Sequence, residues 1–295
     1  MLDLKVSSSE FRSDIHEQRP HVFRNVLEHL PDAGTDLAQA LSAPMHHDGR
    51  VNVFLDGVMP FDLFTENAQD VNEVRRLISL PRIESLLARG ATVAINRIDR
   101  NIPFVRALCD DVQAFSQEVA TANCYAALHG KGSFGSHWDT HDVFALQTHG
   151  MKQWRVWQPS RYLPTSGQGS GGQTRPQEAE LVIDTCLEAG DALYIPRGWW
   201  HDAAPIPGFS TVHLAIGLHV STVVDYVAWL ATTKLAELSD LRRCFSHATS
   251  KPEDLAHVGD ILCSAFKSQL SLQEYQEAHA NLVACRGTRF VESLF

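Results

Sequence analysis

The spacing of apolar residues along the chain changes near residue 220. Between residues 122 and 220, short apolar runs are separated by Gly, Pro and Asp, a pattern typical of strands in a sandwich or barrel. After residue 220 the apolar residues recur at helical spacing. The pattern therefore predicts a mainly β fold followed by a helical segment.

The strands expected in the central region share an apolar interior and turn residues at both ends. They are expected at residues 123–130, 142–150, 153–159, within 180–198, and at 210–221. Residues 160–180 are rich in Gly, Ser and Gln and predict a mobile surface loop at the rim of the site.

The N-terminal part mixes both spacings, and the C-terminal part has only the helical one. Strands are expected at residues 21–27, 50–57 and 91–99, and helices at residues 7–20, 69–80, 81–90 and 105–120. Pro81 is expected to separate the two middle helices. Three more helices are expected at residues 223–238, 252–270 and 271–286, the last opened by a capping box of Ser271 and Glu274.

Composition narrows the class of protein. The chain has 295 residues, 44% of them hydrophobic, and a net charge of −10, which argues against a nucleic-acid binder. The six cysteines form no CxxC pair, as expected for reduced thiols in a cytoplasmic protein. The sequence contains no apolar stretch of about 18 residues, so we expect a soluble protein without a membrane partner.

The candidate chemistry begins with His137, Asp139 and His141 in "GSHWDTHDVF". On a strand, alternate residues share one face, so these three side chains are expected to project together. A His-x-Asp pair alone is more often a satisfied polar pair than a metal site. His201 directly follows the turn "PRGWW", and a rigid turn can bring its side chain to the pair. This third side chain favours a metal site over a satisfied polar pair.

Two imidazoles and one carboxylate on a β fold match the ligand set of non-haem Fe(II) oxygenases. Zinc is the alternative, since it accepts the same donors and would make the site hydrolytic.

The segments "HWD", "GMKQWRVWQP", "LEAGDALYIPRGWWHDA" and "VHLAIGLHVS" resemble the JmjC-type cupins, and most of all the ribosomal oxygenases. The resemblance covers roughly residues 20–220. It implies a double-stranded β-helix, an Fe(II) centre and 2-oxoglutarate as co-substrate. By this resemblance the metal ligands are His137, Asp139 and His201, and the co-substrate is bound by Lys152, Asn123, Tyr125 and His213.

Lys152 also has a chemical argument of its own. A dicarboxylate buried in a barrel needs a cation, and Lys152 is the one Lys or Arg in "DVFALQTHGMKQW". An exposed strand-end lysine is the ordinary alternative. His141 is expected to face the substrate or to be a plain surface residue, whereas His129, His149 and His219 are expected to be structural.

These observations predict a catalytic domain over residues 1–220, with its core at about 92–220, and a helical segment over residues 221–295. The resemblance implies a dioxygenase that hydroxylates an amino-acid side chain of a protein or peptide, expected to be basic because the chain is acidic. A free amino acid as substrate, N-methyl-lysine demethylation, and a metal-binding cupin without oxygenase activity stay open. The 75 residues after Val220 are too few for both the helical and the winged-helix region of the ribosomal oxygenases. We expect the helical segment to form a homodimer.

Overall fold

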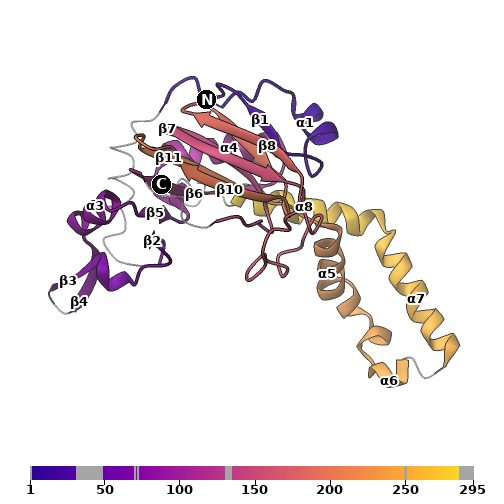
Figure 1. Ribbon diagram of the computed structural model, residues 1–295. Helices are drawn as coiled ribbons and strands as arrows, with labels where there is room; N and C mark the ends of the chain where they lie inside the picture. The colour runs from indigo at the N-terminus through magenta and orange to yellow at the C-terminus, as the bar shows by residue number, and fades with distance from the viewer. Residues whose placement is uncertain are drawn as a thin grey trace, which may run out of the picture. The chain divides into compact units, whose positions relative to one another are not determined.

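A computed structural model of the chain describes residues 2–30, 49–69, 71, 73–129, 135–248 and 251–285. Two units, Met1–His219 and Val220–Phe295, each hold together by their own contacts. The first unit contains every described strand, and the second is helical (Figure 1). None of the helices in these ranges is long and apolar enough to cross a membrane.

The first unit is built mainly from antiparallel strands (Figure 1). Its strands are β1 (His21–Phe23), β2 (Val51–Phe54), β3 (Thr65–Gln69), β4 (Val74–Ile78), β5 (Thr92–Ile95), β6 (Val119–Ala127), β7 (Asp142–Trp157), β8 (Leu181–Glu188), β9 (Ala192–Ile195), β10 (Trp200–Pro205) and β11 (Thr211–His219). Its helices are α1 (Ser8–Asp14), α3 (Leu80–Ala88) and α4 (Pro103–Ser116), with short 3-10 turns η1 (Phe61–Leu63) and η2 (Ile98–Arg100).

Strand β7 organises the sheet. Its first half pairs with β9 and β11, and its second half pairs with β8 and β10. The main sheet runs in the order β1-β9-β7-β11-β6-β5-β2. Side chains from both halves of β7 and from β8 and β9 share one buried apolar cluster, so the two parts of the sheet face each other. This is the jelly-roll arrangement that the sequence predicted.

Strand β7 also corrects a prediction, since the sequence indicated two strands separated at Gly150. Gly150 has a φ of +63°, and a Cβ there would lie 1.8 Å from the Ser210 carbonyl oxygen. Glycine is present because the backbones approach closely at this bend, and the strand continues through it.

The helix expected at residues 69–80 is wrong. Strands β3 and β4 form an antiparallel hairpin there, and Pro81 lies in the first turn of α3 instead of breaking a helix. Val74 is 62% exposed, so its apolar side chain does not lie on a buried helix face. A short apolar run of this kind fits helical and strand spacing equally well.

The second unit consists of α5 (Val223–Thr233), α6 (Phe245–Ala248), α7 (Pro252–Phe266) and α8 (Gln269–Cys285), with 3-10 turns η3 (Leu235–Glu237) and η4 (Ser239–Arg242). A capping box of Thr222 and Asp225 opens α5. Tyr226 packs against the rings of Trp229, Phe266 and Tyr275, which joins α5 to α7 and α8.

The expected capping box at Ser271 is wrong, because α8 begins at Gln269. The Ser268 hydroxyl accepts the Ser271 amide at 3.3 Å and takes the capping role three residues before the predicted cap, Ser271.

Candidate metal centre and adjoining cavity

The candidate metal ligands come from two segments that lie side by side. The amides of His137 and His201 each donate to the carbonyl oxygen of the other residue, at 3.0 and 2.8 Å. The Gly198 amide donates to the Asp139 carbonyl at 3.0 Å. Gly198 has a φ of +86°, and a Cβ there would lie 2.1 Å from the Arg161 carbonyl oxygen, so this turn requires glycine.

The backbone around Asp139 differs from the expected strand. Strand β7 begins only at Asp142, and residues 138–141 are irregular. The alternation that was to place His137, Asp139 and His141 on one strand face is therefore wrong. The backbone bonds to the second segment, and not strand alternation, bring His137 and Asp139 to His201.

His137, Asp139 and His201 form a compact cluster. One nitrogen or oxygen of each side chain lies within 4.8 Å of the corresponding atoms of the other two. The two imidazole centroids are 4.4 Å apart, and His201 Nε2 lies 3.6 Å from Asp139 Oδ2. In the parts of the chain that the structure describes, no other group of three His, Cys, Asp or Glu side chains meets this description.

Hydrogen bonds fix the tautomers of both imidazoles. Nδ1 of His137 lies 3.0 Å from the Gly135 carbonyl oxygen, and Nδ1 of His201 lies 3.0 Å from that of Trp199. A carbonyl oxygen only accepts, so Nδ1 carries a proton in each ring, and the neutral form of each ring has its lone pair on Nε2. This is the tautomer that binds metal through Nε2.

His201 is neutral at physiological pH. Burial, and then the neighbouring His137, lower its pKa to about 4, while Asp139 acts in the opposite direction. The contact of His201 with Asp139 is therefore not an ion pair at pH 7. A neutral imidazole next to a carboxylate fits a divalent cation of the iron or zinc type, with three protein ligands that leave other positions open.

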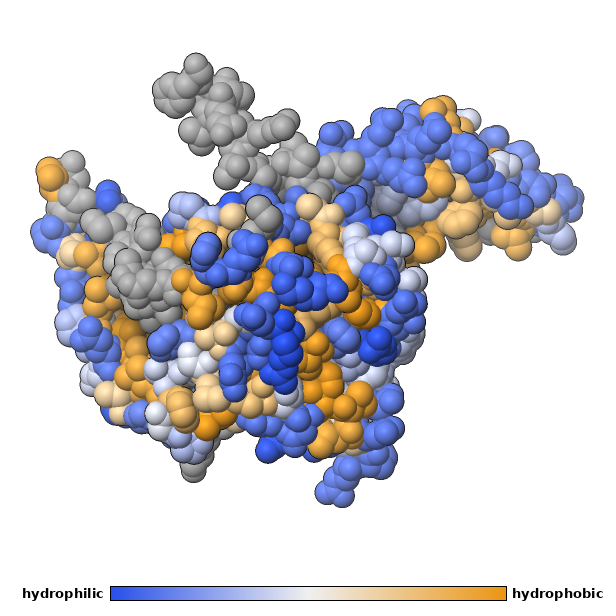
Figure 2. Space-filling model, turned by 90° about the horizontal axis from the view of Figure 1, so that it is seen from above, coloured by the Kyte–Doolittle hydropathy of each residue, from blue (hydrophilic) through white to orange (hydrophobic). Residues whose placement is uncertain are grey.

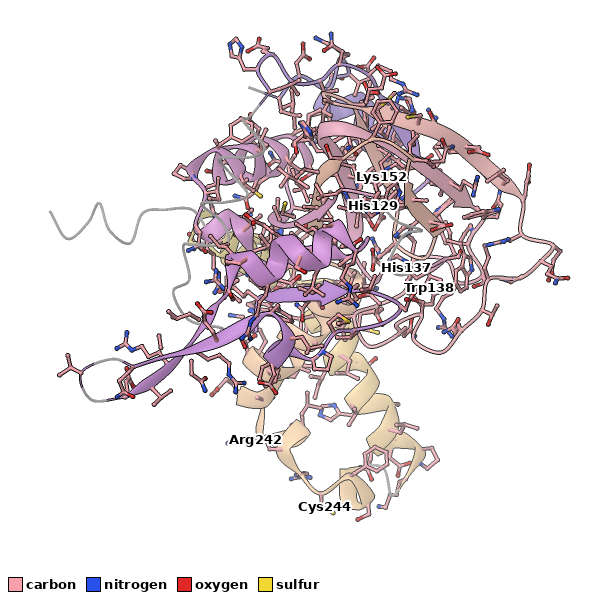
Figure 3. The ribbon with its side chains drawn as sticks, turned by 60° about the vertical axis from the view of Figure 1, so that its left-hand side comes forward. His129, His137, Trp138, Lys152, Arg242 and Cys244 are labelled. Carbon is pink, nitrogen blue, oxygen red and sulfur yellow. The ribbon has the colours of Figure 1, made fainter. Side chains whose placement is uncertain are left out.

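The cluster opens into a cavity of about 300 Å³. The residues predicted to bind the co-substrate all lie on its wall, together with the three candidate ligands: Asn123, Tyr125, Lys152 and His213. Figure 3 shows Lys152 and His137 within the strand-rich unit, with Trp138 next to His137. The structure thus brings together all seven residues that the sequence singled out.

Lys152 is a buried cation in this cavity. Its side chain comes from the second half of β7, and the residue is 6% exposed. Burial lowers its pKa to about 8, so the ammonium form still predominates at pH 7. Its Nζ donates to His213 Nδ1 at 3.4 Å. A buried ammonium group facing a cavity favours an anionic ligand there.

His213 and Tyr125 form the wall next to Lys152. Their rings stack with centroids 5.1 Å apart, and the two residues are cross-strand partners on β11 and β6. Burial, and then the Lys152 charge, keep the pKa of His213 well below its ordinary value, so the ring is neutral. Burial, and then Asp139, raise the pKa of Tyr125, so its hydroxyl stays protonated and can donate.

Trp154 is a cavity residue that the sequence reasoning missed. Its ring meets His213 edge-on with centroids 5.4 Å apart and stacks on His201 at 6.4 Å. It thereby joins the Lys152 side of the cavity to the metal side. Strand alternation could have found it, because Trp154 follows Lys152 by two residues on the same face of β7.

On β6, the Asn123 side chain accepts the Arg97 amide at 3.0 Å.

His141 also lines the cavity without joining the three-residue cluster. A Cβ at Gly217 would lie 2.6 Å from the His141 ring, so glycine makes room for this imidazole. The ring also stacks on His219, whose Nε2 lies 3.0 Å from the Thr121 hydroxyl. His129 and His149 are exposed and bond to Ala88 O and Ser210 Oγ, as structural residues do.

The segment at residues 160–180 has no regular secondary structure but makes defined contacts. The Ser170 hydroxyl donates to the Trp138 carbonyl at 2.7 Å, and the Trp200 indole donates to the Ser160 hydroxyl at 2.9 Å. These bonds join the segment to the residues next to the candidate ligands. Its mobility stays a prediction.

Comparison with known proteins agrees with this geometry. Residues 97–226 match the family model described as the JmjC domain. The bifunctional lysine-specific demethylase and histidyl-hydroxylase NO66 of Drosophila mojavensis is 30% identical over 152 residues, which are 51% of this chain and 17% of that protein. NO66 of Caenorhabditis briggsae is 34% identical over 112 residues, which are 37% of this chain and 14% of that protein. The match therefore spans less than a fifth of the length of either relative.

A structural likeness extends over more of the chain. YcfD, a ribosomal oxygenase from Escherichia coli solved with cobalt and 2-oxoglutarate, has a TM-score of 0.60 at 16% identity. The likeness covers 92% of this chain and 70% of YcfD, and at this identity it concerns the fold. The expected resemblance is confirmed: residues 97–226 match the JmjC domain model, and the fold of the chain is similar to that of YcfD.

Proposed function

We propose that the protein is an Fe(II)- and 2-oxoglutarate-dependent dioxygenase that hydroxylates an amino-acid side chain of a protein or peptide. The observation that carries this proposal is the shared cavity: the three candidate metal ligands and the buried Lys152 line the same space. A zinc hydrolase needs the ligands but has no use for a buried cation beside them. An oxygenase that binds a dicarboxylate needs both.

The side chains divide the work of binding. His137, Asp139 and His201 would hold the iron, which when bound supplies the redox chemistry between dioxygen and the oxo acid. The Lys152 ammonium group would pair with the far carboxylate of 2-oxoglutarate, and the Tyr125 hydroxyl is placed to donate to the same group.

Other residues on the wall hold these groups in place. His213 accepts from Lys152 through Nδ1 and so fixes where the ammonium group points. The Trp154 ring lies between His213 and His201 and excludes water from the space that joins the two binding groups.

The substrate is proposed to be a protein or peptide because NO66 is named a demethylase and histidyl-hydroxylase and YcfD a ribosomal oxygenase. The net charge of −10 favours a basic partner. A free amino acid is the alternative substrate. Mass spectrometry of basic peptides treated with the enzyme would decide, since hydroxylation adds the mass of one oxygen atom and demethylation removes a methyl group.

Metal analysis and turnover test the reaction class. Purified protein supplied with Fe(II) should convert 2-oxoglutarate to succinate, and His137→Ala, Asp139→Ala and His201→Ala should each abolish this conversion while circular dichroism stays unchanged. A wild-type protein that retains zinc and gives no succinate with Fe(II) would favour the hydrolase or binding module. Full activity of any of the three variants would refute the ligand assignment.

We also propose a homodimer formed through the second unit. Large apolar side chains remain exposed on its helices, among them Val224, Val227, Leu255, Leu262 and Phe266. A two-fold contact is the commonest way to cover such side chains. A cytoplasmic location is proposed as well, because Cys109, Cys186 and Cys263 form no disulfide.

A further inference from the structure

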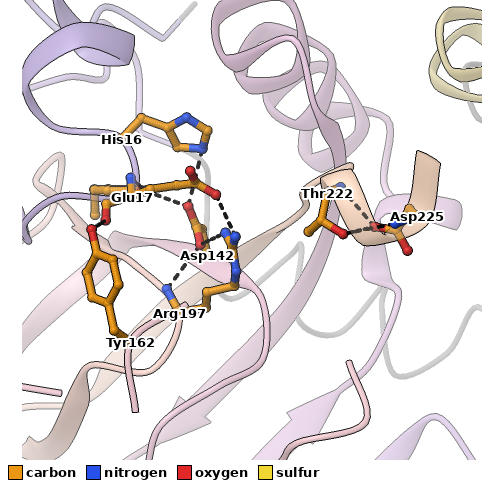
Figure 4. Close-up of polar contacts among 8 residues, drawn as sticks. His16, Glu17, Asp142, Tyr162, Arg197, Thr222 and Asp225 are labelled. Carbon is orange, nitrogen blue, oxygen red and sulfur yellow. Dashed lines mark hydrogen bonds and ion pairs between the residues drawn. The ribbon is translucent and has the colours of Figure 1, made fainter. Parts of the chain in front are cut away.

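Asp142 is a second carboxylate beside the candidate metal centre. It begins β7, three residues after Asp139, and is completely buried. Oδ2 accepts from the Tyr194 hydroxyl at 2.5 Å. Oδ1 accepts from the backbone amide of Arg197 at 3.0 Å and from its Nη1 at 3.1 Å (Figure 4). His16 Nε2 lies 3.3 Å from Oδ2. One buried carboxylate therefore joins the start of β7, the strand β9, the turn after β9 and the N-terminal segment.

The charge of Asp142 is balanced inside the protein. Burial alone would raise its pKa, but the contact with His16 and the hydrogen bonds from Tyr194 and Arg197 outweigh burial and hold the pKa below the ordinary value. Arg197 is itself buried and forms a second ion pair with Glu17, at 2.5 Å. Buried ion pairs of this kind often add little stability over apolar side chains of the same volume, whereas they do fix relative positions.

The positions fixed here are those of the two ligand-bearing segments. Asp142 ends the segment that contains His137 and Asp139, and Arg197 lies in the turn that precedes His201. The backbone bridge between His137 and His201 joins these segments at one end, and the Asp142–Arg197 pair joins them at the other. Between these two joints lies the ligand cluster, whose atoms are within 4.8 Å of one another.

We infer that Asp142 is a positioning residue for the metal centre, and that through Arg197 it sets the distance between the His137–Asp139 segment and His201. The inference rests on the proposed metal site. Residues that orient metal ligands without touching the metal typically change metal affinity by about 10- to 100-fold when they are replaced.

Cobalt(II) titration of the metal-free, full-length protein tests this role. Asp142→Asn removes the charge and one acceptor at nearly constant volume. We expect the dissociation constant for cobalt to rise by about 10-fold or more, with a changed visible absorption spectrum of the bound cobalt. Arg197→Lys keeps a cation near Asp142 but loses the forked donor. We expect it to raise the cobalt dissociation constant less than Asp142→Asn does.

Asp99→Asn is the matched control. Asp99 is also a buried carboxylate, paired with the Arg97 guanidinium and the Ala122 amide instead of with the ligand-bearing segments. Asp99→Asn should lower the thermal midpoint of the metal-free protein as Asp142→Asn does. Its cobalt dissociation constant should stay within about twofold of the wild-type value. Equal loss of cobalt affinity in both variants would show general destabilisation and overturn the inference.

Two further outcomes separate this inference from the proposed function. Folded Asp142→Asn that binds cobalt like the wild type, with the same spectrum, overturns the positioning role alone. A wild-type protein that binds no cobalt overturns the metal site and the positioning role together. If Asp142→Asn does not fold, Arg197→Lys carries the test, and unchanged affinity and spectrum in that variant overturn the inference.

Discussion

At the scale of single residues, Lys152 lies in buried surroundings that disfavour its charged form. Burial lowers its pKa to about 8, and the polar contact of its Nζ is with a neutral His213. The cavity beside it is open for a ligand. A ligand carboxylate there would replace the solvation that the lysine lost on folding, which is why we place the far end of 2-oxoglutarate at this position.

Lys152→Met should therefore weaken the binding of 2-oxoglutarate without changing the binding of iron. The KM for 2-oxoglutarate should rise by about 10- to 100-fold, because a charge-assisted hydrogen bond contributes about 1.5–3 kcal/mol. Iron content should not change, and the thermal midpoint at pH 7 should rise because a buried charge is removed. Arg155→Met is the matched control, since Arg155 is half-exposed on the opposite face of β7 beside Asp184. An unchanged KM in Lys152→Met would mean that another group binds the co-substrate.

The same pKa predicts a pH dependence. The folded-state pKa of about 8 lies below the ordinary value of 10.5, so between these values the unfolded chain binds more protons and the free energy of unfolding gains a contribution that rises with pH. Below pH 8 the full cost of burying the charge is present. The difference in free energy of unfolding between wild type and Lys152→Met, measured by urea denaturation, should shrink from pH 7 to pH 10. A constant difference would contradict the low pKa.

At the scale of elements, β7 shows where the sequence was sufficient. Its apolar residues predicted strands on both sides of Gly150, and the JmjC resemblance and the need for a cation beside a buried dicarboxylate indicated Lys152. The length of β7 was not predictable from the local pattern, because a glycine such as Gly150 usually ends a strand. The close approach of Ser210, the residue before β11, explains why a glycine lies within this strand.

Gly150→Ala is expected to destabilise the protein by more than about 2 kcal/mol, because φ is positive and the added Cβ meets a backbone oxygen. Gly169→Ala is the control, since nothing lies within 4 Å of its added Cβ. It should change the free energy of unfolding by less than about 0.5 kcal/mol. Urea denaturation followed by circular dichroism measures both, and equal stability of the two variants would contradict the close approach.

The residues of the site could be predicted from the sequence, but the backbone geometry that brings them together could not. Residue types and the JmjC resemblance gave His137, Asp139, His201 and Lys152. The irregular backbone at residues 138–141 could not be read from alternation, because it depends on bonds to the distant residues His201 and Gly198. The prediction of a helix at residues 69–80 failed for a related reason: pairing with β3 determines the structure of this segment, and Val74 is exposed instead of buried on a helix face.

At the scale of the whole molecule, apolar and polar residues are mixed on the surface, and orange residues reach it at several places in Figure 2. A mixed surface does not by itself identify a contact. The exposed apolar side chains of α5, α7 and α8 differ because they repeat at helical spacing, which is why the dimer was proposed there.

The dimer is tested in the full-length chain. Light scattering of the wild type should give about twice the 32.8 kDa of one chain. The double variant Leu255→Asp with Leu262→Asp should give the mass of one chain, because charges would be buried in the contact. Val58→Asp, at an exposed apolar residue of the first unit, should leave the mass unchanged. A wild-type mass near 32.8 kDa at every concentration would exclude the dimer.

The bridge between His137 and His201 also has a consequence for the order of folding. Strand β7 needs partners up to β11, and β1 pairs with β9, so the sheet closes through contacts between distant parts of the chain. Such topologies fold slowly, and distant contacts form late. The ligand cluster should therefore be absent from the folding transition state. Cobalt should slow unfolding in proportion to its affinity and leave the refolding rate unchanged. Stopped-flow fluorescence can measure both rates, and faster refolding with cobalt would mean that the two segments meet early.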